Sequence, residues 1–439
     1  MNNYFLAIDL GASSGRHIVG YLKNGEIVLK EVYRFKTLME DSSNGLVWDI
    51  PRIFKEIKLG IKKSFKKYPN IISLAIDTWG VDYVLMNGDK EIPPYYAYRN
   101  ERNLKASKYV NRIIPFEKLY KLTGVQFATF NTIYQFYADK NEGRLDLATD
   151  YLMIPSYFTY KLTGIKTHEY TNESTTSLIN PRSGKYFTSL CEQLELPKKL
   201  FQKISLAGDY VGELLPEIAK EVGGNCKVCL SASHDTASAF EAVDLDDDSI
   251  LISSGTWSLL GIKAKLPIIS SKSLKANFTN EGGIGYVRFL KNIMGMWIAN
   301  RCKSDLDITQ KYIDDHIDEA SYKVTFDVND PSLLAPSDMK KAIIDLTNKC
   351  PPRNDIELFA SIYHSMAKSY KTAIDELEDI TNKTYKKIVI VGGGAKNIYL
   401  NRLVEEYTGK KVIAMPIEAT ALGNIKIQMK ANESLNKKD

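Results

Sequence analysis

The chain has 439 residues and a formal net charge of +5, with 44% hydrophobic and 25% charged residues, as in an ordinary globular protein. This length predicts two or three domains, and so small a net charge gives no reason to expect nucleic acid or a membrane as a partner. No stretch approaches the ~18–20 apolar residues of a membrane span. The N-terminus also lacks the basic region of a signal peptide.

The cysteines indicate a reducing compartment. Five in a chain of this length do not make a disulfide framework. Cys226 and Cys229 form a C-x-x-C pair, but they lie in a run typical of a buried strand, with no second Cys or His pair nearby in the sequence. We therefore expect core thiols, with a redox or metal role as the alternative, and a cytoplasmic protein.

The chain begins with a hairpin. Residues 4–10 and 17–22 are predicted strands joined by a Gly-Ala-Ser loop, and residues 26–36 predict a third strand. A dinucleotide-binding β-α-β unit would instead place a helix after the glycine-rich turn. The P-loop pattern is also absent, because no Lys-Ser or Lys-Thr follows Gly11 at the required spacing. Small residues and backbone N–H groups in such a turn nevertheless suit an anion such as phosphate.

A helix is predicted next, because Asp49 can serve as its N-cap and Pro51 suits its first turn. One face is apolar, and lysines occupy much of the rest; the apolar positions are Phe54, Ile57, Ile61 and Phe65. We predict a solvated helix covering a sheet, with membrane or nucleic-acid contact as the alternative.

Two later strands end in polar motifs. The strand predicted at 71–77 leads into Thr-Trp-Gly-Val-Asp, and the strand predicted at 227–233 ends at His234 and Asp235. A carboxylate at a strand end, followed by small residues, suits a general base, so Asp235 is our candidate.

The second half starts like the first. The acidic residues 244–249 predict an interdomain turn rather than a metal loop, because further ligands are lacking. Residues 249–262 then predict another strand, a Ser-Gly-Thr turn and a strand. Two such hairpins predict two related lobes, which we divide into residues 1–245 and 246–439.

The C-terminal segment alternates helices and strands. We predict a helix at 357–380, a strand at 387–393 that enters Gly392–Gly394, and a helix that ends at Gly409. A strand at 411–416 and a short helix from 418 onward follow. A triple glycine between a strand and a helix makes room for a flat or phosphorylated ligand at the carboxyl end of the strand.

Together these features predict phosphoryl transfer. Two hairpin loops would hold a polyphosphate between the lobes, Asp9 would hold Mg²⁺ through water, and the glycine turn would take the nucleoside. The remaining task is to place and deprotonate an acceptor hydroxyl, which falls to Asp235. Each feature alone has a structural explanation, and their order along the chain favours the catalytic one.

The sequence strongly resembles the FGGY carbohydrate kinases. The matching motifs follow the family's order over nearly the whole chain: DLGASSGR (9–16), IDTWGVDYVL (76–85), AYRNER (97–102), FNTIYQ (130–135), EYTNESTT (169–176), ASHDTASA (232–239), SSGTWSLLG (253–261), TNEGG (279–283), LKNIMGMW (290–297), VGGGAKN (391–397) and EATALGNI (418–425). The resemblance implies an α/β, two-lobed, actin-like ATPase fold of the ribonuclease H-like type, with duplicated lobes and an active-site cleft that closes between them.

The resemblance also implies roles for individual residues. Those that contact ATP are Ala12, Ser13, Ser14, Gly15, Arg16, Thr256, Asn300, Gly393 and Gly394. Those that line the sugar site are Gly80, His234, Asp235, Thr236 and Asn292. Among them, Asp235 is the proton acceptor for O1 of the sugar.

The motifs DTWGVD, SSGTWSL and KNIMG belong to a subfamily and imply ATP-dependent phosphorylation of L-rhamnulose at O1. Another ketose, L-fuculose or a xylulose, is the alternative, because Asn100 stands where the family commonly has Asp. Asn300 replaces a longer Gln, which puts its nucleotide contact in doubt, and the chain is short between Gly283 and Arg288 and at its C-terminal end. A non-catalytic actin-like sugar sensor is a remote alternative, since no DNA-binding extension precedes the first hairpin. We expect ATP, Mg²⁺ and a small sugar as ligands, and a monomer or homodimer.

Overall fold

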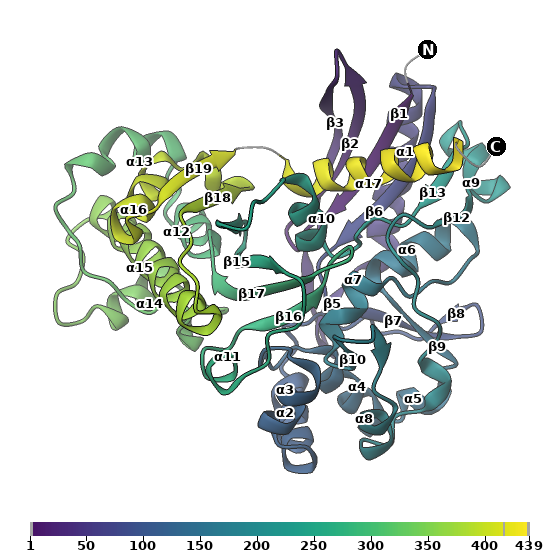
Figure 1. Ribbon diagram of the computed structural model, residues 1–439, viewed down its shortest axis with the longest axis horizontal. Coiled ribbons are helices and arrows are strands. Elements are labelled where there is room, and N and C mark those ends of the chain that lie inside the picture. The colour runs from purple at the N-terminus through teal and green to yellow at the C-terminus, as the bar shows by residue number, and fades with distance from the viewer. Residues whose placement is uncertain (1–2, 416–417, 437–439) are drawn as a thin grey trace.

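The computed structural model describes residues 3–415 and 418–436, and it has two lobes joined side by side (Figure 1). Each lobe is built on a mixed six-stranded sheet covered by helices, so the predicted two-lobed α/β architecture is confirmed. The strand orders are β12-β13-β6-β1-β2-β3 in the first lobe and β16-β17-β15-β14-β18-β19 in the second.

The two sheets share one plan. The first contains β1 (Tyr4–Leu10), β2 (Ser14–Lys23), β3 (Glu26–Lys36), β6 (Ile71–Thr78), β12 (Tyr210–Glu213) and β13 (Lys227–Cys229). The second contains β14 (Ser249–Ser254), β15 (Trp257–Ala264), β16 (Thr279–Gly282), β17 (Val287–Met294), β18 (Lys387–Val391) and β19 (Lys411–Met415). In the first sheet β1 and β2 form an antiparallel hairpin, and β6 and then β13 lie parallel to β1 on its other side. In the second sheet β14 and β15 form the corresponding hairpin, and β18 and β19 lie parallel to β14. This shared order supports the predicted duplication.

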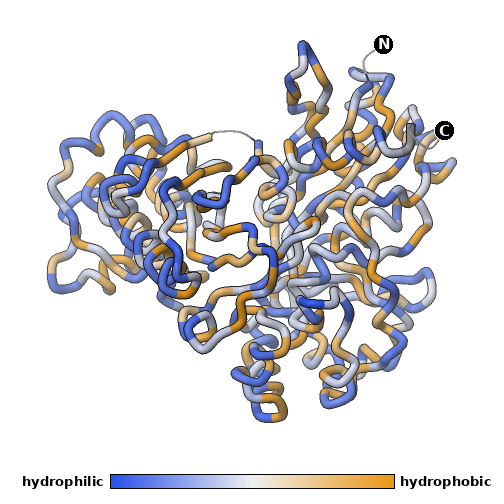
Figure 2. Tube along the Cα trace, in the orientation of Figure 1, coloured by the Kyte–Doolittle hydropathy of each residue, from blue (hydrophilic) through white to orange (hydrophobic). Residues whose placement is uncertain are grey.

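Helices and small sheets complete the lobes. In the first lobe these are α1 (Ile50–Lys67), α2 (Arg102–Ile113), α3 (Phe116–Thr123), α4 (Thr132–Asn141), α5 (Arg144–Leu147), α6 (Ile154–Thr163), α7 (Tyr170–Glu173), α8 (Thr188–Gln193), α9 (Pro216–Val222), β4 (Met39–Ser42), β5 (Gly45–Trp48), β7 (Tyr83–Asn87), β8 (Lys90–Glu91), β9 (Asp150–Met153), β10 (Ile179–Asn180) and β11 (Lys185–Tyr186). In the second they are α11 (Ser271–Lys275), α12 (Trp297–Leu306), α13 (Gln310–His316), α14 (Met339–Leu346), α15 (Asp355–Thr381) and α16 (Ile398–Thr408). Hydrophilic stretches cover the outer turns of both lobes (Figure 2).

Local signals in the sequence placed several elements well. The Asp49 side chain accepts a hydrogen bond from the Arg52 N–H and caps α1 as predicted. Gly409 ends α16 in the left-handed conformation, with φ of 64°. The strand predicted at 227–233 is shorter and ends at Cys229. Beyond it Leu230 bonds to Asp209, and the chain contacts β6 again at Ser233, whose carbonyl accepts from the Thr78 N–H. Strand β2 is longer than predicted, since it already begins at Ser14.

The last helix of each half packs on the sheet of the other half. Helix α10 (Asp235–Ala242) buries Phe240 in a cluster with Leu251 of β14 and Val391 of β18. Helix α17 (Ala419–Asn436) buries Ile425 in a cluster with Ala7 of β1. Figure 1 shows α17, at the C-terminal end of the colour scale, lying beside the strands of the first lobe. The division between residues 245 and 246 therefore stays a prediction, because each half of the chain ends in a helix that packs on the sheet of the other half.

Helices α10 and α17 cross at very close range. A β-carbon added to Gly423 would lie 1.7 Å from the backbone oxygen of Ser238. Polar contacts fix α17 in place as well: Nε2 of Gln428 donates to the Leu6 carbonyl, and Nδ2 of Asn424 donates to the Asp77 carboxylate. The crossing therefore ties the two lobes together through backbone contact.

The two cysteines of the C-x-x-C pair lie in the core of the first lobe. Cys226 and Cys229 are buried and free, and burial raises the pKa of each thiol to about 12, so the interpretation as core thiols is confirmed. Across residues 3–415 and 418–436, no helix is both long and apolar enough to cross a membrane.

A buried cation holds the segment that follows α6. Nδ1 of His168 lies 3.0 Å from the Glu173 carboxylate and Nε2 lies 3.2 Å from that of Asp150. Burial by itself lowers the pKa of His168, but the two carboxylates outweigh it and raise the pKa to about 9. The imidazole is therefore charged at neutral pH and fixes α7 against β9.

The helix crossing gives a test of stability. Gly423→Ala should destabilise the protein by about 2 kcal/mol or more, because its β-carbon would collide with the Ser238 backbone. Urea unfolding followed by circular dichroism measures the shift in midpoint. Ser434→Ala, on the exposed side of the same helix, is the control and should change little. Equal midpoints for Gly423→Ala and wild type would contradict the close crossing.

The His168 ion pair predicts a pH dependence of stability. An ordinary histidine in the unfolded chain has a pKa near 6.5, so the folded protein binds the proton more tightly. The stabilisation is complete below pH 6.5 and is lost as the pH rises through about 9, by on the order of 3 kcal/mol. Denaturation midpoints of wild type and His168→Gln should therefore converge between pH 6.5 and 9.5. A constant difference would contradict a charged His168.

Candidate active site

A cleft of about 660 Å³ lies between the lobes. It is lined by nearly all the residues singled out from the sequence: Asp9, Ala12, Ser13, Ser14, Arg16, Gly80, His234, Asp235, Thr236, Thr256, Asn292, Asn300 and Gly393. Residues from opposite ends of the chain thus meet in one space, as the motif order predicts.

Two predicted ATP-contacting glycines do not line this cleft. Gly15 lies in β2, where a β-carbon would be 2.4 Å from the ring of Phe35. A β-carbon on Gly394 would be 2.0 Å from Oγ of Ser254. Both positions need glycine for close packing under the turns, and their contact with ATP stays a prediction.

Three glycine-containing turns converge on the cleft. The first closes between β1 and β2, where the Gly11 N–H donates to the Ser14 carbonyl. The second joins β14 to β15, where the Gly255 N–H donates to the Trp257 carbonyl. The third follows β18 at Gly392, whose φ is 83°. Because β1 and β14 occupy equivalent places in the two sheets, their turns face the cleft from both lobes.

Two buried carboxylates lie behind the first turn. Asp9 and Asp77 are direct neighbours on the parallel strands β1 and β6. Burial raises the pKa of both. Repulsion from Asp9 adds to the rise at Asp77, and repulsion from Asp235 adds to the rise at both, whereas Arg16 opposes the rise at Asp9. Nδ2 of Asn424 donates to Oδ2 of Asp77 at 2.5 Å, but no described residue hydrogen-bonds Oδ1. The sequence analysis did not identify Asp77 as a site residue. Its position near the end of a strand, like that of Asp9, could have indicated it.

These carboxylates suit Mg²⁺, whose ligands in proteins are oxygens. The unpartnered oxygen of Asp77 and the adjacent Asp9 supply hard donors at the end of the sheet. In the described part of the chain, no group of three or more His, Cys, Asp or Glu side chains could hold a metal ion. The residues would therefore fit a Mg²⁺ that keeps several of its waters, rather than one held only by protein oxygens.

Arg16 links the first turn to the second lobe. Its guanidinium forms ion pairs with Asp9 and with Glu418, which directly precedes α17. Burial opposes the positive charge, but the two carboxylates outweigh it and raise the pKa of Arg16. Arg16 therefore carries a permanent positive charge beside the first turn.

Strained backbone lines the cleft beside His234. Val81 has a φ of 68°, which is rare for a β-branched residue. Thr175 Oγ1 accepts from the Val81 N–H, and side chains of Thr132 and Gln135 donate to its carbonyl. These bonds hold the turn in which Gly80 leaves space beside His234, since a β-carbon there would lie 3.4 Å from Nε2.

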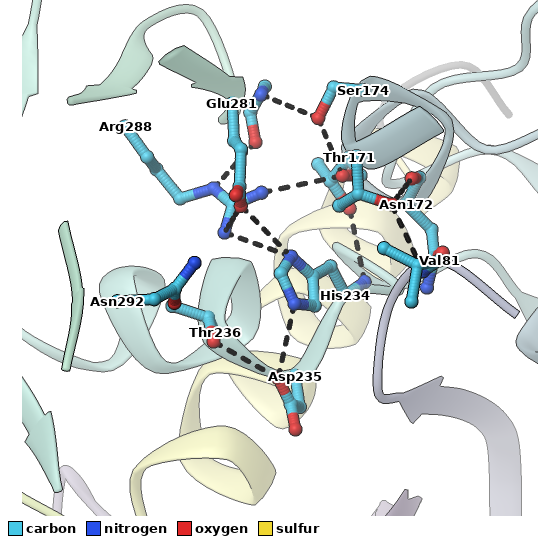
Figure 3. Close-up of polar contacts among 12 residues, drawn as sticks. Val81, Thr171, Asn172, Ser174, His234, Asp235, Thr236, Glu281, Arg288 and Asn292 are labelled. Atoms are coloured by element: carbon cyan, nitrogen blue, oxygen red, sulfur yellow. Dashed lines mark hydrogen bonds and ion pairs between the residues drawn. The ribbon is translucent and has the colours of Figure 1, made fainter. Parts of the chain in front are cut away.

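Asp235 is the first residue of α10 and remains accessible, with 32% of its side chain exposed (Figure 3). The Thr236 hydroxyl donates to Oδ1 at 3.1 Å, and Nε2 of His234 lies 3.5 Å from the same oxygen. No described residue donates a hydrogen bond to Oδ2. The carboxylate therefore has one anchored oxygen and one that can face a ligand.

Glu169 fixes the loop before α10. Its buried carboxylate accepts hydrogen bonds from the backbone N–H groups of Thr171, Asn172 and Ser233, and from two of their hydroxyls. Burial raises the pKa of Glu169, while these donors lower it. The EYTNESTT motif is thereby joined to the SASHD motif, a structural task that the sequence did not reveal.

The far end of the cleft is lined by α12 and α13. Asn300 is exposed there, and Nζ of Lys303 donates to Gln310 at 2.9 Å. Burial lowers the pKa of Lys303. Asn397 caps α16 and also lines the cleft. The predicted contact of Asn300 with the nucleotide stays a prediction.

Asn100 does not line the cleft. Its Nδ2 donates to the carbonyls of Asn44 and Leu46 and so holds the β4–β5 loop. This residue therefore gives no direct argument for a different ketose.

Comparison with known proteins agrees with this architecture. Residues 4–240 match the N-terminal domain, and residues 250–432 the C-terminal domain, of the FGGY family of carbohydrate kinases. The rhamnulokinase of Oceanobacillus iheyensis is 42% identical, over 98% of this chain and 94% of that protein. The rhamnulokinase of Bacillus subtilis is 38% identical, over 97% and 90%.

Solved structures show the same fold. A gluconate kinase from Lactobacillus acidophilus superposes with a TM-score of 0.82 over 99% of this chain and 90% of that chain, at 16% identity. A ligand-bound xylulose kinase from the same organism gives 0.82 over 98% and 90%, also at 16% identity. With both family domains matched in order and relatives that span nearly its whole length, the chain belongs to the FGGY family of carbohydrate kinases.

Proposed function

We propose that the protein catalyses ATP-dependent phosphorylation of L-rhamnulose at O1, giving L-rhamnulose 1-phosphate and ADP. The activity named for its relatives supports the substrate. The observation that carries the chemistry is that Asp235 shares one cleft with turns from both lobes. Transfer of a phosphoryl group to a hydroxyl requires an accessible base beside a site for the phosphates, and glycine-containing turns suit phosphates.

In the proposed reaction, Asp235 accepts the proton of the O1 hydroxyl as that oxygen attacks the γ-phosphorus of ATP. Backbone N–H groups of the Ala12–Ser14 and Thr256 turns hold the phosphates, and Arg16 adds positive charge. Gly80, His234, Thr236 and Asn292 orient the sugar.

Asp9 would hold a Mg²⁺ through water, and the ion would supply neutralisation of phosphate charge when bound. The adenosine would lie against Gly393 at the far end of the cleft. Closure of the lobes would exclude water, which otherwise competes as phosphoryl acceptor. We also infer a cytoplasmic monomer or homodimer; the five free cysteines support a reducing compartment.

A panel of ketoses tests the substrate. L-Rhamnulose, L-fuculose, L-xylulose and D-xylulose are compared by coupled release of ADP, and the highest kcat/KM is expected for L-rhamnulose. A large preference for another ketose would overturn the substrate assignment but not the kinase. No turnover with any sugar would favour a non-catalytic sugar sensor.

Replacing the proposed base tests the mechanism. Asp235→Asn should lower kcat by ~10²–10⁴-fold, because an amide cannot take the O1 proton. Binding of ATP, measured by calorimetry, should be unchanged. Asp247→Asn, in the exposed acidic turn between the lobes, is the matched control and should keep full activity. Near-normal turnover of Asp235→Asn would rule out this residue as the base.

A further inference from the structure

The contacts behind Asp235 centre on one fully buried arginine. Arg288, on β17 of the second lobe, has no exposed side-chain surface (Figure 3). Its Nε donates to the Gly282 carbonyl at 2.7 Å, and Nη2 donates to the Thr171 carbonyl at 3.3 Å. Its Nη1 lies 3.1 Å from Nδ1 of His234 and 3.1 Å from Oε2 of Glu281. Arg288 therefore connects the second lobe to the loop that carries the proposed base.

These contacts constrain the protonation of His234. A guanidinium has only donors and keeps its proton in proteins, so the ring nitrogen that faces it must accept. Nδ1 of His234 then carries no hydrogen, and the hydrogen of the neutral ring lies on Nε2. Glu281 lies 3.3 Å from the same Nδ1 and would favour a hydrogen there. Its carboxylate already faces Arg288, and a hydrogen on Nδ1 would point at the guanidinium.

We propose that Arg288 is a positioning residue that fixes His234 with its hydrogen on Nε2, and thereby selects which oxygen of Asp235 acts as the base. With that tautomer, Nε2–H of His234 faces Oδ1 of Asp235 at 3.5 Å, the same oxygen to which the Thr236 hydroxyl donates. Oδ2 is left free to accept the O1 proton. The role of Asp235 as base rests on the proposed function. The tautomer of His234 does not, since it can be observed without substrate.

The arrangement also couples the base to the lobes. Glu281 and Arg288 come from β16 and β17 of the second lobe, whereas His234 and Asp235 come from the first. Glu281 offsets the charge of Arg288, and at the end of β16 the Gly282 N–H donates to the Ser174 hydroxyl of the first lobe. Orientation of the base therefore depends on how the lobes are joined, as well as on α10 itself.

The tautomer of His234 can be read in the wild-type protein. Long-range ¹H–¹⁵N spectra distinguish protonated from unprotonated ring nitrogens, and the chain has only five histidines. The His234 signals are assigned by their absence in His234→Asn. A hydrogen on Nε2 and none on Nδ1 is expected in the ligand-free protein. A hydrogen on Nδ1, or on both nitrogens, would overturn the proposal without touching the proposed function.

Variants of Arg288 test the consequence for catalysis. Arg288→Met should move the His234 hydrogen to Nδ1, facing Glu281, and lower kcat by up to roughly 10²-fold with little change in KM for ATP. Arg288→Lys, which keeps a donor-only cation, should retain the wild-type tautomer and recover part of kcat. Folding of each variant is checked by circular dichroism.

The matched control is Lys291→Met on the same strand as Arg288, which removes an ion pair with Glu376 of α15 and does not touch His234. It should leave both the tautomer and kcat unchanged. A folded Arg288→Met with wild-type tautomer and kcat would overturn the proposal; if that variant does not fold, the wild-type spectrum decides alone. Absence of wild-type turnover with L-rhamnulose would instead count against the proposed function and leave the tautomer result intact.

Discussion

The close crossing of α10 and α17 is the constraint on which the rest of the molecule depends. Each helix belongs by chain order to one lobe and is buried on the sheet of the other, so the lobes cannot separate without exposing both apolar faces. The crossing has room for no side chain at Gly423. Both helices begin at the cleft, α10 with Asp235 and α17 with Ala419 beside Glu418. The contact that joins the lobes therefore also places polar groups between them.

Negative charge is concentrated at one end of that cleft. Asp9 and Asp77 are buried side by side, and burial raises the pKa of both. Arg16 is shared between Asp9 and Glu418 and so compensates only part of this charge. A bound cation would relieve the remaining repulsion, whereas a bare polyphosphate would add to it. This electrostatic balance is consistent with a nucleotide that arrives together with Mg²⁺.

The part of the cleft around Asp235 is held in place for a different reason. Val81 is held in a strained conformation by three hydrogen bonds, and Glu169 joins two distant motifs through backbone and hydroxyl donors. Arg288 adds a buried charge that is compensated by Glu281. Buried polar groups of this kind favour one arrangement strongly, because any other would leave them unpaired. The accessible carboxylate of Asp235 is thus supported from several sides by groups that have little freedom.

By itself the sequence determined the elements and the motifs: residues 26–36 form the strand predicted for them, and Gly409 ends a helix as predicted. Such features depend on local periodicity and on single-residue conformational preferences, which are visible within a short window. Tertiary structure alone decided which strand ends meet, that Gly15 serves packing against a ring, and that Asp77 lies beside Asp9. It also decided that Arg288 reaches His234, because contacts between residues far apart in the chain depend on how whole sheets and helices pack, and no local pattern records that.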